Sequence, residues 1–577
     1  MNIFKELWHD LVTIGSIVCD DKEVWALGSL EAPKDHLNGD ISTNIAMIIA
    51  AKYGSNPREI SLQLKEHLLQ IPYIAHIEVA GPGFINFTIK ADKWHECIRS
   101  IINDEKDFWQ ENIGNGFKIN VEYVSANPTG PMHIGHARGA VYGDALANVL
   151  KLCGYDVTKE YYINDAGSQI DTLLDSAFIR YKEVITGKEI IIPEGLYPGE
   201  YLKDVGKKIA DKFGSGLLNL NINDINLKIK DLVIDEMMSL IKHDLAELGV
   251  HHDVFFSEQS LHKNNKIDDT IKVLEQKGLI YTGILPPPKG KIDEEWQEKE
   301  QLLFRSSNFG DDQDRPVQKG DGSWTYLAAD FAYAKDKIDR GFKNLVYILG
   351  ADHSGYVKRI QAVINALSDD QVKSDVRISQ LVNFVKEGVP IKMSKRSGNF
   401  MTVSDVTSQV DKDIIRFMML TRRNDMTLDF DFDKVKLQSK DNPVFYVQYA
   451  HVRTKSIMAK AIETIPLAYE KFINEEFNLS LLSTEEEIQL IKLLASWPKT
   501  LISAARTCEP QKISYYLIEV ASRFHSIWNL GKDNNDYRFN VEEDIELTAA
   551  RLAFVDSVRK VLAVGFSVIG VKPIDKM

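Results

Sequence analysis

Helical and strand-like hydrophobic patterns alternate in the first part of the chain. Apolar side chains recur at helical spacing over residues 3–18 and 41–53. Two short strand-like runs then flank Gly81-Pro82-Gly83, a strong turn signal. The pattern predicts a small α+β module over residues 1–110.

A strand, a loop, a helix and a second strand are predicted next. Apolar residues alternate in Lys118–Ser125, helical spacing runs from about residue 136 to 152 and ends at Gly154, and a second strand follows at 157–163. This order is a βαβ unit, which implies a parallel sheet that binds ligands at the carboxyl ends of its strands. We expect an α/β nucleotide-binding domain over residues 111–400.

The rest of the chain is expected to be mainly helical. Residues 171–320 are polar with helical spacing, which predicts an insertion into the nucleotide-binding domain, after which the sheet resumes at 345–349 and 380–386. The strand-like pattern then stops. We expect a connecting segment at 401–440 and an all-helical domain over 441–577.

Composition places the chain among soluble globular proteins. It has 577 residues, of which 44% are hydrophobic and 26% charged, enough for several cores. The net charge of −14 excludes a generic basic nucleic-acid coat but allows a local basic groove.

The cysteines and the termini favour a reducing compartment. Cys19, Cys97, Cys153 and Cys508 lie far apart with no CxxC pair, which argues against a zinc site or a disulfide framework. Charged residues interrupt the apolar N-terminal stretch, and no apolar run is long enough to span a membrane. We expect a cytoplasmic protein without membrane contact.

The first chemical motif is His133-Ile134-Gly135-His136, at the start of the helix in the βαβ unit. Two imidazoles three residues apart share a helix face, and a helix N-terminus favours phosphate. Gly135 would let a nucleotide base approach the backbone. The alternative is two helix-cap histidines with an ordinary packing glycine.

The second motif is the basic loop Lys392-Met393-Ser394-Lys395-Arg396-Ser397-Gly398, which follows a predicted strand. Two lysines three positions apart can hold a triphosphate and neutralise charge that develops during phosphoryl or adenylyl transfer. By itself the loop could be a solvated basic turn. Its occurrence together with the histidine motif favours a nucleotide site, and the chain has no GxxxxGK[ST] phosphate loop.

These two motifs resemble the signatures of class I aminoacyl-tRNA synthetases, and longer strings resemble the arginyl-tRNA synthetases within that class. The strings are Val121–Gly130, Tyr161–Gly167, Phe309–Asp312, Thr325–Asp330, Gly350–His353 and Tyr446–His451. The resemblance covers nearly the whole chain. It implies a Rossmann-type catalytic domain between an N-terminal domain that binds the tRNA elbow and a helical anticodon-binding domain.

The resemblance implies ATP-dependent attachment of arginine to its cognate tRNA through an arginyl adenylate, with release of pyrophosphate and AMP. His133 and His136 would bond the phosphates, Gly135 would pack under adenine, and Lys392 and Lys395 would clamp the pyrophosphate with Mg²⁺ held through phosphates. No zinc is expected, and we expect a monomer. The implied ATP-binding residues are Ala126, Asn127, Pro128, Thr129, Gly130, Pro131, Met132, His133, Ile134, Gly135, His136, Lys392, Met393, Ser394 and Lys395.

The amino-acid pocket should present acceptors and a carboxylate to a guanidinium. Tyr326 and Asp330 are four residues apart in a predicted helix, so their side chains can enter one pocket. The resemblance places both on the guanidinium, with Glu122 and Asn127 lining the pocket and Asp352 near the α-amino group. Alternatively, Asp330 is a surface residue of an amphipathic helix and Glu122 only orients its neighbours.

Two tRNA-binding surfaces are also implied. Phe84 and Asn86 match the family's N-terminal motif that receives a flipped-out elbow base; otherwise Phe84 belongs to the strand core and Asn86 to the turn. Tyr446, Tyr449 and Arg453, with Met577, match anticodon-side positions. Their spacing of three and four residues is also that of a buried helix face.

The sequence supports three other functions less well. A cysteinyl-tRNA synthetase needs clustered Cys and His for zinc, and these are scattered here. Synthetases for large aliphatic amino acids normally carry a longer editing insertion than 171–320. A non-catalytic tRNA-binding paralogue would have lost signature residues, and all of them are present.

Overall fold

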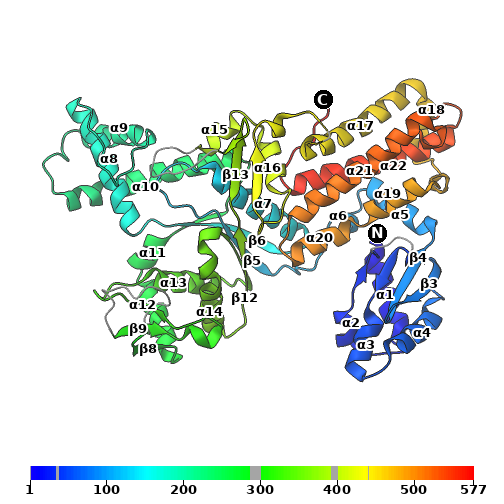
Figure 1. Cartoon of the computed structure of the whole chain (residues 1–577), viewed down its shortest axis with the longest axis horizontal. Helices are drawn as coiled ribbons and strands as arrows, with labels where there is room; N and C mark the ends of the chain where they lie inside the picture. The colour runs from blue at the N-terminus through cyan, green and yellow to red at the C-terminus, as the bar shows by residue number, and fades with distance from the viewer. Residues whose placement is uncertain (1, 34–37, 286–299, 391–400, 440) are drawn as a thin grey trace.

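The computed structural model describes residues 2–33, 38–285, 300–390, 401–439 and 441–577. Figure 1 shows a separate N-terminal module, a central α/β region from which a helical arm extends, and a bundle of helices at the C-terminal end. None of the helices in the described ranges combines the length and the apolar character that a membrane span requires.

The N-terminal module is a four-stranded antiparallel sheet covered by helices, with strand order β1-β2-β4-β3. Residues 41–53 are not one helix as expected, because Ile41–Thr43 pairs with β4 and the helix starts after Asn44. The β-branched residues of this short stretch favour a strand. The elements are α1 (Ile3–Gly15), α2 (Lys22–Leu27), β1 (Leu30–Glu31), β2 (Ile41–Thr43), α3 (Ile45–Tyr53), α4 (Pro57–Leu68), β3 (Ile74–Ala80) and β4 (Phe84–Ile89). The next two helices, α5 (Ala91–Ile102) and α6 (Lys106–Trp109), lie against the C-terminal helices instead.

The central sheet has five parallel strands in the order β12-β11-β5-β6-β7. The expected βαβ unit is confirmed, with α7 connecting the two central strands β5 and β6. The elements are β5 (Lys118–Tyr123), η2 (Ile134–His136), α7 (Ala137–Leu152), β6 (Asp156–Ile163), β7 (Val254–Ser257), β11 (Asn344–Gly350), η4 (Ala351–Tyr356), α14 (Val357–Ser368) and β12 (Lys373–Ser379).

The strand predicted near 380–386 belongs to a different sheet. β13 (Val382–Lys386) pairs with β14 (Val389–Pro390) and β15 (Leu428–Asp431), and the edge of the central sheet is β12 instead. Burial of β12 is only intermediate along its length after an exposed first residue, so it lacks the apolar run that marks a central strand.

Residues 171–320 are helical only in part. The arm in Figure 1 contains α8 (Ser168–Thr186), α9 (Tyr201–Phe213) and α10 (Ile222–Glu247), but the chain then returns to the central sheet as β7. A second antiparallel sheet follows. The elements here are α11 (Glu258–Lys263), α12 (Lys266–Gln276), β8 (Ile280–Gly283), β9 (Gln301–Phe304), η3 (Ser306–Phe309), β10 (Arg315–Pro316) and α13 (Tyr326–Asp339).

The C-terminal helices appear where helical spacing predicts them, with one break. Within the expected helical domain, residues 485–506 form two helices, because Pro498 lacks the N–H of a continuous helix and sits in the first turn of a new one. The elements are α15 (Val403–Thr407), α16 (Lys412–Met419), η6 (Lys434–Lys436), α17 (Pro443–Thr464), α18 (Pro466–Ile473), η7 (Leu479–Leu481), α19 (Glu485–Ala495), α20 (Trp497–Arg506), α21 (Gln511–Asp533), η8 (Asn535–Tyr537) and α22 (Ile545–Val568).

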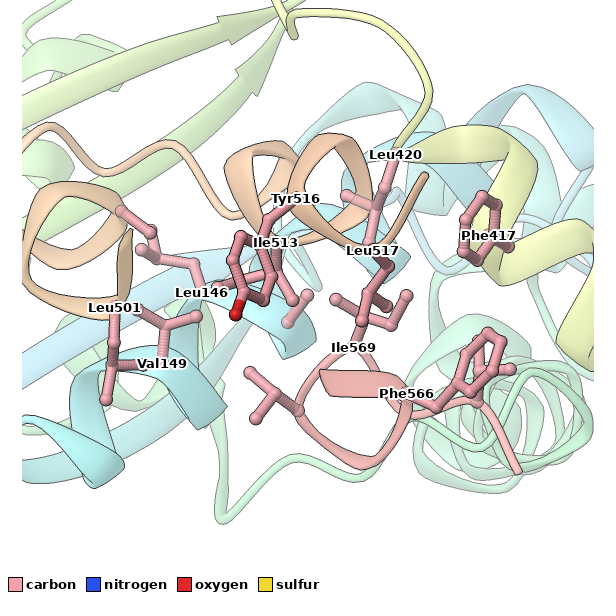
Figure 2. Packing of buried hydrophobic residues seen from close by; sticks show 14 of the residues in the cluster. Leu146, Val149, Phe417, Leu420, Leu501, Ile513, Tyr516, Leu517, Phe566 and Ile569 are labelled. Atoms are coloured by element: carbon pink, nitrogen blue, oxygen red, sulfur yellow. The ribbon is translucent and has the colours of Figure 1, made fainter. Parts of the chain in front are cut away.

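One hydrophobic core joins the central domain to the helical bundle. Figure 2 shows Leu146 and Val149 of α7 together with Leu501, Leu517 and Phe566 from the C-terminal helices. All four cysteines are also buried, with exposures of 0–7%. The bundle is therefore packed directly against the helix that follows the histidine motif.

A buried arginine lies at the same junction. The Arg416 guanidinium of α16 is 2.6 Å from the Asp144 carboxylate of α7 and also donates to the Ile569 carbonyl at 3.0 Å and the Leu248 carbonyl at 2.9 Å. It thus ties together the ends of α10 and α22, α7 and α16. The other Asp144 oxygen accepts from the Lys159 ammonium of β6 at 3.1 Å. Removing Asp144 would therefore leave Arg416 buried without its carboxylate partner.

Candidate active site

A cavity of about 670 Å³ opens at the carboxyl ends of β5, β6 and β11. This is the edge at which a parallel α/β sheet binds ligands. The five residues expected in an amino-acid pocket all line it, together with residues of the expected ATP segment. The lining includes Glu122, Ala126, Asn127, His136, Tyr162, Gln169, Glu258, Tyr326, Asp330, Tyr347 and Asp352.

Helix α13 carries the first acidic group of the cavity. It begins at Tyr326, which is 57% exposed at the rim, and Asp330 lies one turn further along. Burial, together with the nearby carboxyls of Glu258 and Glu122, raises the pKa of Asp330 well above its ordinary value. A cation in this cavity would reverse that effect and favour the ionised carboxylate.

Glu258 adds a second carboxyl that sequence reasoning missed. It is the first residue of α11 and is only 4% exposed. Burial raises its pKa to about 7, a shift that its hydrogen bond with Tyr162 opposes. The residue follows a four-residue strand in a region that looks polar and helical, so its position beside Asp330 could be known only from the fold.

Glu122 already has a cationic partner inside the protein. The fully buried Lys337 ammonium is 2.6 Å from its carboxylate and lies 4.2 Å and 4.1 Å from the ring centroids of Tyr333 and Tyr347. The hydroxyl of Ser125 donates to the other carboxylate oxygen at 3.3 Å. This geometry favours the orienting role for Glu122 over direct charge pairing with a ligand.

The chain leaves β5 through a strained turn. Val124 and Ser125 have φ angles of 72° and 41°, in the left-handed region that a β-branched residue rarely adopts. The Tyr161 hydroxyl donates to the Ala126 carbonyl at 2.7 Å, and the Tyr201 hydroxyl of α9 donates to the Thr129 carbonyl at 2.6 Å. These contacts hold the segment 126–132 beside the cavity.

The two histidines lie in a 3-10 turn just before α7, and not within the helix itself. Their rings stack with centroids 3.7 Å apart and an interplanar angle of 19°. A Cβ on Gly135 would lie 2.8 Å from Nδ1 of His133. The glycine therefore makes room for the histidine ring, and access for a nucleotide base stays a prediction.

The basic loop itself, including Lys392, Met393, Ser394 and Lys395, lies outside the described residues. The residues that follow it are paired with the histidine segment. The Ile134 N–H donates to the Met401 carbonyl at 3.0 Å, and the Val403 N–H donates to the Met132 carbonyl at 3.0 Å. The two signature segments therefore meet in space although more than 250 residues separate them in sequence.

Family models match three successive parts of the chain. They are the arginyl-tRNA synthetase N-terminal domain at residues 14–89, the catalytic domain of class I (R) tRNA synthetases at 97–438, and the DALR anticodon-binding domain at 447–577. The chain belongs to the arginyl-tRNA synthetase family. It is a class I synthetase that attaches arginine to tRNA through an arginyl adenylate.

Relatives in this family match the chain from end to end. Arginine–tRNA ligases from Rickettsia bellii and Rickettsia felis are 59% and 58% identical to it, with 100% of each chain covered. The solved arginyl-tRNA synthetases of Thermus thermophilus and Plasmodium falciparum superpose with TM-scores of 0.71 at 18% and 16% identity. Those matches cover 100% of this chain and 100% and 99% of the solved chains; at such identities they show the shared fold alone.

The synthetase presents one of its two expected elbow residues to solvent. Phe84 is 40% exposed at the start of β4, whereas Asn86 lies in the middle of that strand and is only 6% exposed. The alternative that Asn86 is a turn residue is wrong. Phe84 is the residue of this pair with an aromatic face open to a base.

On the helical domain, the expected residues form part of an aromatic cluster along α17. The Arg453 guanidinium lies 4.3 Å from the Tyr449 ring centroid and 4.7 Å from that of Trp528, and His525 packs 4.6 Å from Tyr446. Tyr449 is 38% exposed, so this face is not simply core.

The C-terminal tail of the synthetase lies along α17. His451 Nδ1 is 2.9 Å from the Ile574 carbonyl, and the Gln448 amide donates to the Lys572 carbonyl at 2.9 Å. These contacts hold the tail as far as Ile574 against the helix that carries Tyr449, and Met577 follows with 53% of its surface exposed.

No site for a resident metal is present in the described part of the synthetase. Within residues 2–33, 38–285, 300–390, 401–439 and 441–577, no group of three or more His, Cys, Asp or Glu side chains is placed to hold an ion.

Proposed function

We propose that arginine and ATP meet in the cavity at the carboxyl ends of β5 and β11. The observation that carries this proposal is the lining of one cavity by Asp330, Glu258 and Tyr326 together with Ala126, Asn127 and His136. The first three offer carboxylates and a phenol to a cation, and the others belong to the segment that the family resemblance assigns to ATP.

In this assignment the guanidinium pairs with Asp330 and Glu258 beside Tyr326. A partly buried carboxyl whose pKa is raised by desolvation and by neighbouring carboxyls gains most from a planar cation. Asp352, which is exposed near the mouth, takes the α-amino group. Glu122 and Asn127 line the pocket, with Glu122 oriented by Lys337.

The ATP segment runs from Ala126 to His136. His133 and His136 hydrogen-bond phosphate oxygens, and adenine packs over Gly135. Lys392 and Lys395 neutralise the charge that develops on the α-phosphate and on the leaving pyrophosphate. Mg²⁺ bound to the phosphates adds further neutralisation.

The first step joins arginine to AMP. A carboxylate oxygen of arginine attacks the α-phosphorus, the bond between the α-phosphorus and the bridging oxygen to the β-phosphate breaks, and pyrophosphate leaves. In the second step a ribose hydroxyl of the terminal adenosine of tRNA attacks the arginyl carbonyl carbon. The bond between that carbon and the phosphate oxygen breaks, AMP leaves, and the hydroxyl proton is lost to solvent or phosphate. Most of the acceleration comes from orientation and charge stabilisation.

For tRNA, we propose that Phe84 stacks on an elbow base, with Asn86 in the strand beneath, and that Tyr446, Tyr449, Arg453 and Met577 form the anticodon-side surface. The exposed aromatic faces and the arginine support stacking and phosphate contact. We also propose that the cognate partner is the tRNA for arginine and that the enzyme is a cytoplasmic monomer. Sedimentation of the purified chain tests the monomeric state.

Pyrophosphate exchange across all amino acids, with and without tRNA, tests the assignment. Asp330→Asn should raise the arginine KM by a factor equivalent to about 2–5 kcal/mol while leaving the ATP KM within about twofold. Asp339→Asn is the matched control, because Asp339 lies on the same helix and pairs with the exposed Lys335 at 2.7 Å. An Asp330→Asn arginine KM within about twofold of wild type would show that the pocket is assigned wrongly.

A further inference from the structure

The last turn of α10 places a buried carboxylate between the two signature segments. Asp244 is only 2% exposed, and its two oxygens accept hydrogen bonds from different parts of the chain. The Met132 N–H donates to Oδ2 at 2.7 Å, and the Ser404 hydroxyl donates to Oδ1 at 2.9 Å. Met132 immediately precedes the histidine motif, and Ser404 lies shortly after the basic loop.

The stability of α10 does not explain an acidic residue at this position. A negative charge near a helix C-terminus opposes the helix dipole, and burial penalises the ionised carboxyl and raises the pKa of Asp244. The Asp244 carboxylate therefore costs the helix free energy. Its hydrogen bonds with Met132 and Ser404 offset part of that free-energy cost.

The bond to Met132 fixes the end of the segment 126–132 that leads into the histidine motif. Pro128 and Pro131 have no N–H, and Met132 is buried, so its amide needs an acceptor inside the protein. The Met132 carbonyl in turn accepts from the Val403 N–H at 3.0 Å. Asp244 thus closes a loop of bonds that runs from α10 to Met132, from Met132 to Val403, and from Ser404 back to α10.

We propose that Asp244 is a positioning residue for adenylate formation, which locks the histidine segment and the segment leaving the basic loop into one arrangement. The inference rests on the proposed role of residues 126–136 in binding ATP. Asp244 lines no part of the arginine cavity. Its loss should therefore disturb the alignment of ATP and leave arginine binding nearly unchanged.

Single-turnover adenylate formation and pyrophosphate exchange test this role. Asp244→Ala should lower kcat by about 10- to 100-fold, the scale of a small misplacement of reacting groups, with the arginine KM within about twofold. Asp244→Asn should stay within about threefold of wild type. Its amide oxygen can accept from Met132, and its amide N–H₂ can donate to the Ser404 hydroxyl.

Two further variants separate positioning from general damage to the helix. Glu236→Gln is the matched control, because Glu236 lies two turns earlier on α10 and pairs with Lys208 of α9 at 2.5 Å, and it should leave kcat unchanged. Ser404→Ala should lower kcat in the wild-type background and add little to Asp244→Ala, since the partner is already absent there. If Asp244→Ala fails to fold, Ser404→Ala carries the test instead. It should lower kcat both alone and in the Asp244→Asn background, where the substituted amide can still bond the Ser404 hydroxyl.

Several results would overturn the proposal. They are an Asp244→Ala kcat within threefold of wild type, an equal loss in Glu236→Gln, a Ser404→Ala kcat equal to wild type, or an arginine KM that changes while kcat does not. A parallel His136→Ala variant isolates the underlying assignment. If it retains full adenylation, the ATP role of the histidine segment is wrong whatever Asp244 does.

Discussion

Arginine binding should strengthen as pH rises through neutrality, and Glu258 should be responsible. In the empty cavity burial raises the pKa of this carboxyl to about 7. A guanidinium beside it would favour the ionised form and lower that pKa, so binding must release protons. Affinity is therefore greatest above the pKa of the empty protein and falls as pH decreases through it.

The size of the effect follows from the ionised fraction of Glu258. With a pKa of about 7, roughly a tenth of the groups are ionised at about pH 6 and roughly nine-tenths at about pH 8. The arginine Kd should rise about tenfold, or about 1.4 kcal/mol, when pH falls over that range. The pKa of Asp330 is also raised, so its ionisation changes the Kd in the same direction. A rise of about tenfold is therefore a lower bound on the change in the arginine Kd.

Calorimetric titration of arginine at several pH values, in two buffers of different ionisation enthalpy, measures both Kd and the protons released. His136 and His353 also line the cavity, so a Glu258→Gln variant is needed to isolate the carboxyl. This variant should bind like wild type near pH 6 and progressively worse above it. Glu275→Gln, at an exposed position of α12, should keep the wild-type slope. A wild-type Kd constant within twofold, or an unchanged slope in Glu258→Gln, would refute the reasoning.

Three further predictions address other parts of the enzyme. Lys395→Ala should lower kcat for adenylation by about 10² to 10³, or ~3–4 kcal/mol, with little change in the arginine KM, because the contact forms mainly in the transition state; a single-turnover loss below about threefold would assign the role to another cation. Asp144→Asn should reduce unfolding free energy by about 3–5 kcal/mol in urea titrations by leaving the buried Arg416 without its carboxylate partner, whereas Glu519→Gln, which breaks an exposed pair, should change it by less than about 0.5 kcal/mol. Tyr449→Ala combined with deletion of Met577 should impair tRNA charging more than adenylate formation at saturating tRNA, and an equal loss in both assays would instead indicate a folding defect.

The fold was predictable where hydrophobic periodicity is strong and local. Strand β5 and helix α7 are central and largely buried, and strand β6 beside them is buried at alternate stretches, so their apolar patterns are clear. The edge strands β7 and β12 were missed because one is four residues long and the other is nowhere fully buried. The segment of β13 was recognised as a strand, but its partners lie in another sheet, and a local pattern does not encode the pairing partner.

The residues of the candidate site were likewise predictable from the sequence only in part. Tyr326 and Asp330 were found because they lie in a string that resembles the family, and helical spacing, which places them one turn apart, agrees with a shared pocket. The family motifs also lie at strand ends, where a parallel sheet binds ligands. Glu258 and Asp244 come from short or polar elements far away in sequence, and only the folded chain brings them to the cavity or to the histidine segment. Residues that act through a tertiary contact leave no periodic signal.

The burial of all four thiols makes the wild-type enzyme a ready background for site-directed labelling. Cys19 is 7% exposed, and burial raises the pKa of Cys97, Cys153 and Cys508 to about 12, so little thiolate is available to a maleimide near neutral pH. A cysteine introduced on the surface of the N-terminal module and another on the helical bundle would react selectively without removal of native ones. Distances between two such dyes could then follow whether the module that carries Phe84 moves relative to α17 when tRNA binds.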